Sequence, residues 1–132
     1  MEKRRVVITG IGVVAPNGIG IENFWDSLVH GQSGVRKITH FDATSYPCQI
    51  AAEVPNFDPT DYMDPKTAKR LGRFAQFALA ASEMAVEDSG IEFDKEEPYR
   101  IGVFIGTAIG GGDTIETQHA IYFNKGLKRI SP

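Results

Sequence analysis

Glycines are concentrated in one stretch of the sequence that has the composition of a ligand-binding turn. Residues 106–112 read Gly-Thr-Ala-Ile-Gly-Gly-Gly and directly follow an apolar run, residues 101–105. Clustered glycines permit positive φ angles and let the backbone approach another group closely. In open α/β sheets, ligands bind beyond the carboxyl ends of the strands. The pattern therefore predicts either a ligand-binding turn or a tight turn without a ligand.

A second glycine motif lies near the N-terminus. Residues 10–15, Gly-Ile-Gly-Val-Val-Ala, match the G-x-G-x-x-G/A pattern of dinucleotide-binding proteins. That fingerprint requires a helix to begin within the motif, so that the helix N-terminus faces the pyrophosphate. Here Pro16, Asn17, Gly18 and Gly20 follow, and these are loop residues. A dinucleotide-binding module is therefore the weaker alternative, and titration with NAD(H) would test it.

Nucleophilic and metal-binding residues are few. Cys48 is the one cysteine, and the three histidines are His30, His40 and His119. None of the four has metal-ligand spacing with another, and no histidine stands beside Cys48 as a fixed base. We therefore expect no metal site, no cofactor and no catalytic residue in this chain.

A cluster of basic residues marks the start of a long predicted helix. Lys66, Lys69, Arg70 and Arg73 follow Asp64 and Pro65, which have the residue types of an N-cap and a first helical position. Cations at a helix N-terminus oppose the helix dipole by a few tenths of a kcal/mol each. The cluster therefore indicates either a negatively charged partner or a solvated basic face.

The elements that would position these residues follow from the hydrophobic pattern. Short apolar runs predict buried strands over residues 5–11 and 101–105, and Cys48 to Val54 alternates loosely, as in an edge strand. Apolar residues at helical spacing predict helices over residues 21–30, 65–89 and 114–124. Residues 32–46 show no period and are expected to form a loop. Together these elements predict an α/β fold with a mixed sheet flanked by helices.

Composition limits the classes of function. The chain has 132 residues, a formal net charge of −3, and 42% hydrophobic residues, as in an ordinary globular domain. We therefore expect no nucleic-acid partner, and no apolar run is long enough to cross a membrane. A single cysteine is compatible with a reducing compartment such as the cytoplasm.

Several sequence blocks, in one order, resemble the elongating β-ketoacyl-acyl carrier protein synthases, and synthase II in particular. These blocks are RRVVITGIGVVAPNG, HGQSGV, HFDA, EDSGI, RIGVFIGTAIGGG and KRISP. The resemblance runs from Lys3 to Pro132. It implies a thiolase-like fold, of which residues 1–132 would be the N-terminal portion of the first βαβ-rich half. It also implies a cytoplasmic homodimer.

The resemblance implies fatty-acid elongation by decarboxylative Claisen condensation with acyl- and malonyl-loaded acyl carrier protein. The family's catalytic cysteine, two histidines and lysine lie downstream of the KRISP block, so we expect this chain alone to be inactive. It would supply binding surface instead. Ile109, Gly110 and Gly111 match the gate of the acyl pocket, and a second set matches the carrier-protein surface: Lys66, Lys69, Arg70, Lys128 and Arg129. A chain-length factor, or a non-catalytic carrier-binding or dimerisation module, remains the alternative.

Overall fold

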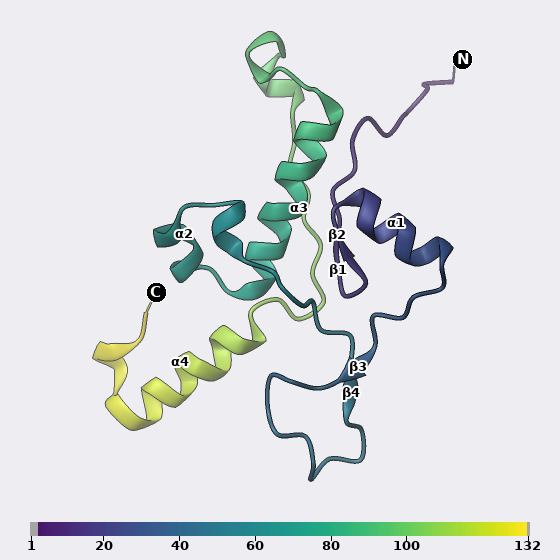
Figure 1. Ribbon diagram of the computed structural model, residues 1–132. Helices are drawn as coiled ribbons and strands as arrows, with labels where there is room; N and C mark the ends of the chain where they lie inside the picture. Colours follow the sequence, from purple (N-terminus) through teal and green to yellow (C-terminus); the bar gives the residue numbers. More distant parts are fainter. Residues whose placement is uncertain (1–2, 132) are drawn as a thin grey trace. The chain divides into compact units, whose positions relative to one another are not determined.

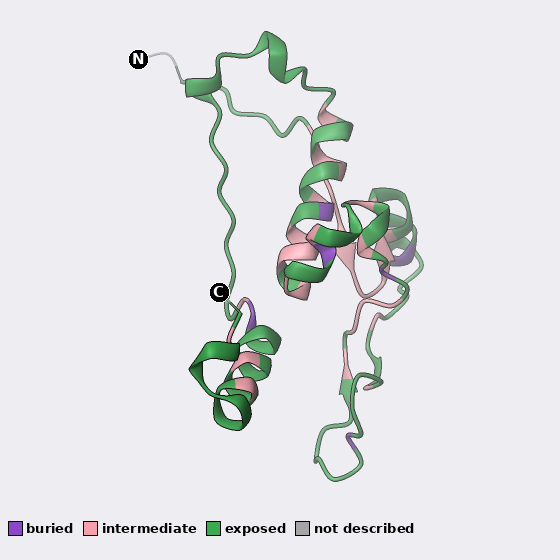
Figure 2. Cartoon of the chain, turned by 90° about the vertical axis from the view of Figure 1, so that its left-hand side faces the viewer, coloured by how far each residue is buried: buried purple, intermediate pink, exposed green. Residues whose placement is uncertain are grey.

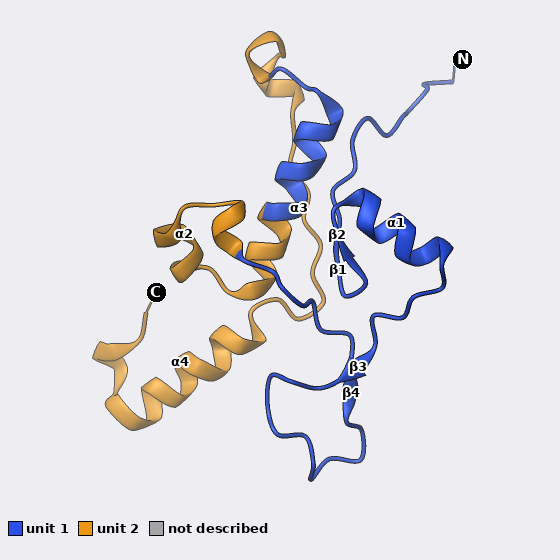
Figure 3. Cartoon of the chain, viewed as in Figure 1, with its two compact units in different colours: residues 1–58, 80–92 blue, residues 59–79, 93–132 orange. Residues whose placement is uncertain are grey.

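The chain forms two compact units. The computed structural model describes residues 3–131, so the ends of the expected 1–132 domain, including the last residue of the KRISP block, lie outside the described residues. The first unit comprises residues 1–58 and 80–92, and the second comprises residues 59–79 and 93–132 (Figure 3). The helix α3 (Arg73–Ser89) contributes residues 73–79 to the second unit and residues 80–89 to the first.

The first unit contains two short antiparallel ribbons and a helix. β1 (Val14–Ala15) pairs with β2 (Gly18–Ile19), and β3 (Arg36–Lys37) pairs with β4 (Ile50–Ala51). α1 (Ile21–Val29) follows β2 and packs against it (Figure 1). The predicted helix over residues 21–30 is thus confirmed. The edge strand predicted from Cys48 to Val54 is confirmed only at β4, and its partner β3 lies in the segment expected to be a loop.

The apolar face of α1 is not buried as predicted. Trp25 is 64% exposed and Leu28 is 49% exposed, whereas Ser27 is the buried residue of the helix. Trp25 and Leu28 stay exposed because β2, the strand against which α1 packs, has two residues and covers only a small part of the helix surface.

The two predicted buried strands are wrong as elements of this structure. Residues 5–11 and 101–105 are extended but unpaired, and the strands of the described residues are confined to the two short ribbons. Val6 is 90% exposed and Phe104 is 97% exposed. A buried strand needs a hydrogen-bonded neighbour on its edge and a helix on each face. Within residues 3–131 neither segment pairs with another strand.

Two helices replace the single helix predicted over residues 65–89. α2 (Pro65–Arg70) ends at Leu71, whose backbone is extended, and α3 (Arg73–Ser89) begins after Gly72. Glycine is a poor helix former. A Cβ on Gly72 would also lie 2.7 Å from the Thr114 Oγ1, so the chain bends where two elements approach closely.

The second unit contains α4 (Gly112–Lys125), which confirms the predicted helix over residues 114–124. Most of α4 is exposed (Figure 2). Residues 3–131 also contain four short 3₁₀ helices: Pro59–Asp61, Phe93–Lys95, Pro98–Arg100 and Leu127–Arg129. The buried apolar residues are mostly small, namely Ala43, Phe57, Ala68 and Ala80.

Candidate functional site

The glycine turn projects one apolar side chain. Ile109 is 85% exposed, and Gly111 is the N-cap of α4 with φ 80° and ψ 20°, in the left-handed region. The Gly111 carbonyl accepts the Ile115 amide at 2.8 Å, so α4 begins directly after the turn. The arrangement presents an exposed, branched apolar side chain on a glycine-rich turn.

A side chain at Gly110 would force its neighbours to shift. A Cβ there would lie 2.7 Å from the Thr107 Oγ1 and 2.8 Å from two ring carbons of Phe74. At Gly111 the positive φ alone disfavours any side chain, and a Cβ would meet the Phe74 ring at 3.2 Å. The close approach predicted for these glycines is therefore real, and the group approached is Phe74 of the same unit.

Asp64 fixes the start of the basic helix α2. Its carboxylate accepts the backbone amides of Lys66 and Thr67, both at 3.0 Å, which confirms the predicted N-cap. The hydroxyl and then the amide of Thr67 lower the pKa of the Asp64 carboxyl below its usual value. Asp64 thus stays ionised at neutral pH and offsets part of the unfavourable interaction between the helix dipole and the lysines.

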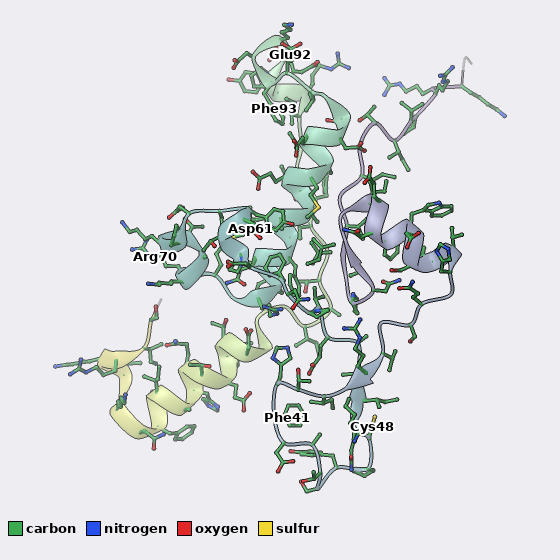
Figure 4. All side chains as sticks on the ribbon, viewed as in Figure 1. Phe41, Cys48, Asp61, Arg70, Glu92 and Phe93 are labelled. Atoms are coloured by element: carbon green, nitrogen blue, oxygen red, sulfur yellow. The ribbon has the colours of Figure 1, made fainter. Side chains whose placement is uncertain are left out.

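Two of the predicted basic residues line a polar hollow in the second unit. The hollow has a volume of about 750 Å³ and lies between the end of α2 and the start of α4. Figure 4 shows Arg70 at the end of α2. The lining residues are Lys69, Arg70, Leu71, Gly72, Asp113, Thr114, Thr117, Gln118 and Ser131.

The remaining basic residues of the predicted surface lie apart from this hollow. Lys66 is on the exposed side of α2, while Lys128 and Arg129 are exposed on the 3₁₀ helix after α4. The segment after them is tied to α4, because the Ser131 amide donates to the Gln118 side chain at 2.7 Å. The structure therefore brings Lys69 and Arg70 together, and places Arg129 at a separate hollow with Ile121 and Lys125.

Cys48, His30 and His40 each have a local hydrogen-bond or ionic contact. Cys48 is exposed beside β4 (Figure 4), and its Sγ lies 3.5 Å from the Ile50 carbonyl. His30 caps α1 and its Nδ1 lies 3.2 Å from an Asp26 carboxylate oxygen. His40 donates its backbone amide to Glu53 at 3.3 Å. Among residues 3–131, no three histidine, cysteine or acidic side chains are grouped to hold a metal ion.

The N-terminal glycine motif has a packing role. A Cβ on Gly10 would collide with the Ala85 carbonyl oxygen, and one on Gly12 would collide with that of Ala81, so both glycines lie directly against α3. The first helix after the motif, α1, begins only at Ile21. The motif therefore does not contain the helix start that a dinucleotide would need.

Two contacts at this site were not predicted from the sequence. Phe74 lies on the glycine turn, and the Gln76 amide nitrogen donates to the carbonyls of Ala68 and Leu71 at 2.8 and 3.1 Å. Phe74 falls in the apolar stripe of the predicted helix and Gln76 falls on its polar flank. Phenylalanine and glutamine are common at such positions, so neither residue stands out in the sequence. The signal that points to them is Gly72, since a glycine within a helical pattern indicates a break.

Comparison with known proteins decides the family. The family model described as "Beta-ketoacyl synthase, N-terminal domain" matches residues 3–132. The chain belongs to the β-ketoacyl synthase family.

Relatives in this family extend far beyond the matched region. The 3-oxoacyl-acyl-carrier-protein synthase 2 of Vibrio harveyi is 45% identical over 132 residues, and that of Coxiella burnetii is 48% identical over the same length. The match covers 100% of this chain and 32% of each relative. The chain therefore spans about a third of the length of these synthases.

Solved structures of ketosynthases share the backbone arrangement. The ishigamide ketosynthase/chain length factor superposes with a TM-score of 0.81 at 33% identity, over 99% of this chain and 33% of its own. A type II PKS ketosynthase, solved in complex with its acyl-carrier protein, gives a TM-score of 0.77 at 24% identity, over 98% of this chain and 33% of its own. The thiolase-like fold class expected from the sequence is confirmed. No helix within residues 3–131 is both long and apolar enough to cross a bilayer.

Proposed function

We propose that the chain is the N-terminal part of a β-ketoacyl-acyl carrier protein synthase II, which lengthens fatty acyl chains. The observation that carries this proposal is the match of the whole chain to two 3-oxoacyl-acyl-carrier-protein synthases 2 at 45% and 48% identity. In the proposed reaction, an acyl group passes from its carrier protein to a cysteine of the synthase. Malonyl-carrier protein then loses carbon dioxide, and the resulting carbanion attacks the acyl thioester, forming a carbon–carbon bond and releasing the cysteine thiolate.

Residues of this chain would act in binding. Ile109 would contact the acyl tail, and Gly110 and Gly111 would allow the turn to approach it closely. The exposed cations of α2 and of the 3₁₀ helix after α4 would meet the acidic carrier protein. Cys48 and the histidines match none of the catalytic positions of the family, so the condensation itself depends on other residues of the synthase.

The test is a condensation assay on the full-length synthase that contains this segment. Acyl-carrier protein and malonyl-carrier protein are mixed with the enzyme, and the products are identified by mass spectrometry. We expect a β-ketoacyl product two carbons longer than the acyl substrate, together with an acylated cysteine. A full-length protein that is never acylated and gives no such product would refute the proposal.

A chain-length factor is the second candidate, because one structural relative at 33% identity is a ketosynthase/chain length factor. Chain-length factors share the fold but lack the cysteine. The acylation step of the same assay separates the two candidates, since only the synthase forms a covalent acyl-enzyme.

We also infer that the synthase is a cytoplasmic homodimer. The resemblance to synthase II supports the dimer, and the lone exposed cysteine fits a reducing compartment. A native mass equal to that of one chain would contradict the homodimer. Secretion of the protein would contradict the cytoplasmic location.

A further inference from the structure

The aromatic ring of Phe74 lies against three glycines of the second unit. The Cβ positions of Gly110 and Gly111 would be 2.8 and 3.2 Å from ring carbons, and that of Gly72 would be 3.3 Å away. The ring therefore occupies the space on one side of the glycine turn that side chains would otherwise fill.

Hydrogen bonds fix the backbone segment that carries the ring. Phe74 is in the first turn of α3, and the Gly72 carbonyl accepts the amides of Ala75 and Gln76 at 2.9 and 3.1 Å. The side chain of Gln76 donates to the carbonyls of Ala68 and Leu71, so the start of α3 is fastened to the end of α2. These bonds fix the backbone of Phe74 relative to the end of α2.

We propose that Phe74 is a positioning residue for the glycine turn and thereby sets how far Ile109 extends toward the acyl chain. Three glycines in a row have wide conformational freedom. A rigid ring on one side excludes the conformations that shift the turn toward α3. This inference rests on the proposed function, in which Ile109 contacts the acyl tail.

The experiment uses five variants of the full-length synthase: Phe74→Leu, Phe74→Tyr, Gly110→Ala, Phe74→Leu combined with Gly110→Ala, and Phe77→Leu as the control. Phe77 is on the same helix, but its ring lies under the Arg73 guanidinium, 4.8 Å from the ring centroid. Two quantities are measured, namely hydrogen–deuterium exchange of the amides in residues 106–112 and the rate of condensation for short and long acyl substrates.

We expect Phe74→Leu to raise amide exchange in the turn several-fold and to shift the ratio of long-chain to short-chain rates. Phe74→Tyr keeps the ring and should match the wild type, as should Phe77→Leu. Gly110→Ala should be less damaging in the Phe74→Leu background than alone, because the smaller side chain leaves room for the added methyl group.

Unchanged exchange in Phe74→Leu overturns the proposal, whatever the activity of the enzyme. Raised exchange with an unchanged chain-length ratio overturns the link to Ile109. A wild-type protein that fails to condense acyl groups would refute the proposed function. The positioning role of Phe74 would still be tested by the exchange data, because amide exchange is measured without substrate.

Discussion

Ile109 is the side chain on which substrate selection by the proposed synthase depends most directly. Its exposed position on the glycine turn leaves room for a larger group. We expect Ile109→Phe to lower the rate for long acyl chains while sparing short ones, because the larger ring shortens the space for the tail. The measurement is the initial condensation rate of the full-length synthase across a series of acyl lengths.

The matched control is Ile115→Phe, the same change at an exposed isoleucine on α4. It should leave the chain-length profile as in the wild type. Equal rates for every acyl length in the Ile109 variant would contradict the gate role.

Asp64 gives α2 a pH dependence that can be measured at single amides. Because the folded-state pKa of this carboxyl is lowered from 3.8, its stabilising effect is complete above that value and is lost as the pH falls through the lower, folded-state pKa. We expect the Lys66 and Thr67 amides to lose exchange protection at that acidic limit. Asp64→Asn, whose amide oxygen is a cap without a charge, provides the comparison at each pH.

Protection that falls equally in the Asp64→Asn variant and the wild type would show that another group controls the helix start. Asp64→Ala, which removes the cap, should reduce protection of both amides at every pH.

At the residue scale, the sequence predicted positions whose type alone limits the backbone. Asp64 before Pro65 indicated an N-cap, and the Asp64 carboxylate accepts the amides of Lys66 and Thr67. Phe74 could not be predicted in the same way. Its role depends on contact with Gly110, which is distant in the sequence, and an aromatic residue in a helical stripe is equally suited to many neighbours.

At the element scale, α2 is the feature that should govern association with the carrier protein. We expect Lys66→Glu and Lys69→Glu to weaken binding, chiefly through a slower association rate, and we expect binding of the wild type to weaken as salt is added. Surface plasmon resonance with immobilised carrier protein at several ionic strengths measures both effects.

Lys37→Glu in β3 is the matched control, since it makes the same charge change on an exposed residue of the first unit. Binding that is indifferent to salt, or a control as damaging as the α2 variants, would count against the basic surface.

Helices were predicted better than strands for a physical reason. A helix satisfies its backbone hydrogen bonds within one segment, so local spacing suffices to predict α1 and α4. A strand needs a partner strand for its hydrogen bonds. The apolar runs at residues 5–11 and 101–105 indicate that these segments should be buried, but they do not identify the strand or helix that would cover them. The break between α2 and α3 was not predicted because Leu71 and Gly72 fit a helical spacing. In the structure the backbone of Leu71 is extended, and Gly72 lies close to the Thr114 side chain.

At the scale of the whole molecule, exposed apolar surface should dominate the behaviour of the isolated chain. Val6, Ile8 and Phe104 are each more than 80% exposed. Large apolar side chains that are exposed in this way favour association. We expect the purified chain of 132 residues to bind a hydrophobic dye, to self-associate in sedimentation experiments, and to show no condensation activity.

The full-length synthase is the control, and it should bind little dye. A monomeric chain that binds no dye would show that the apolar segments are covered in solution, and a condensation rate above the blank would contradict the assignment of this segment to binding alone.

The contact between the first apolar segment and α3 also has a consequence for synthesis on the ribosome. The Ile11 amide donates to the Asp88 carboxylate at 2.9 Å, across 77 positions of sequence. At about 5–20 residues per second, roughly 4–15 seconds of translation separate the emergence of the two partners. During that interval Gly10, Ile11 and Gly12 lack the neighbours that they contact on α3. Substitutions that slow the docking of Gly10 and Gly12 would prolong the time that this segment stays without its partner.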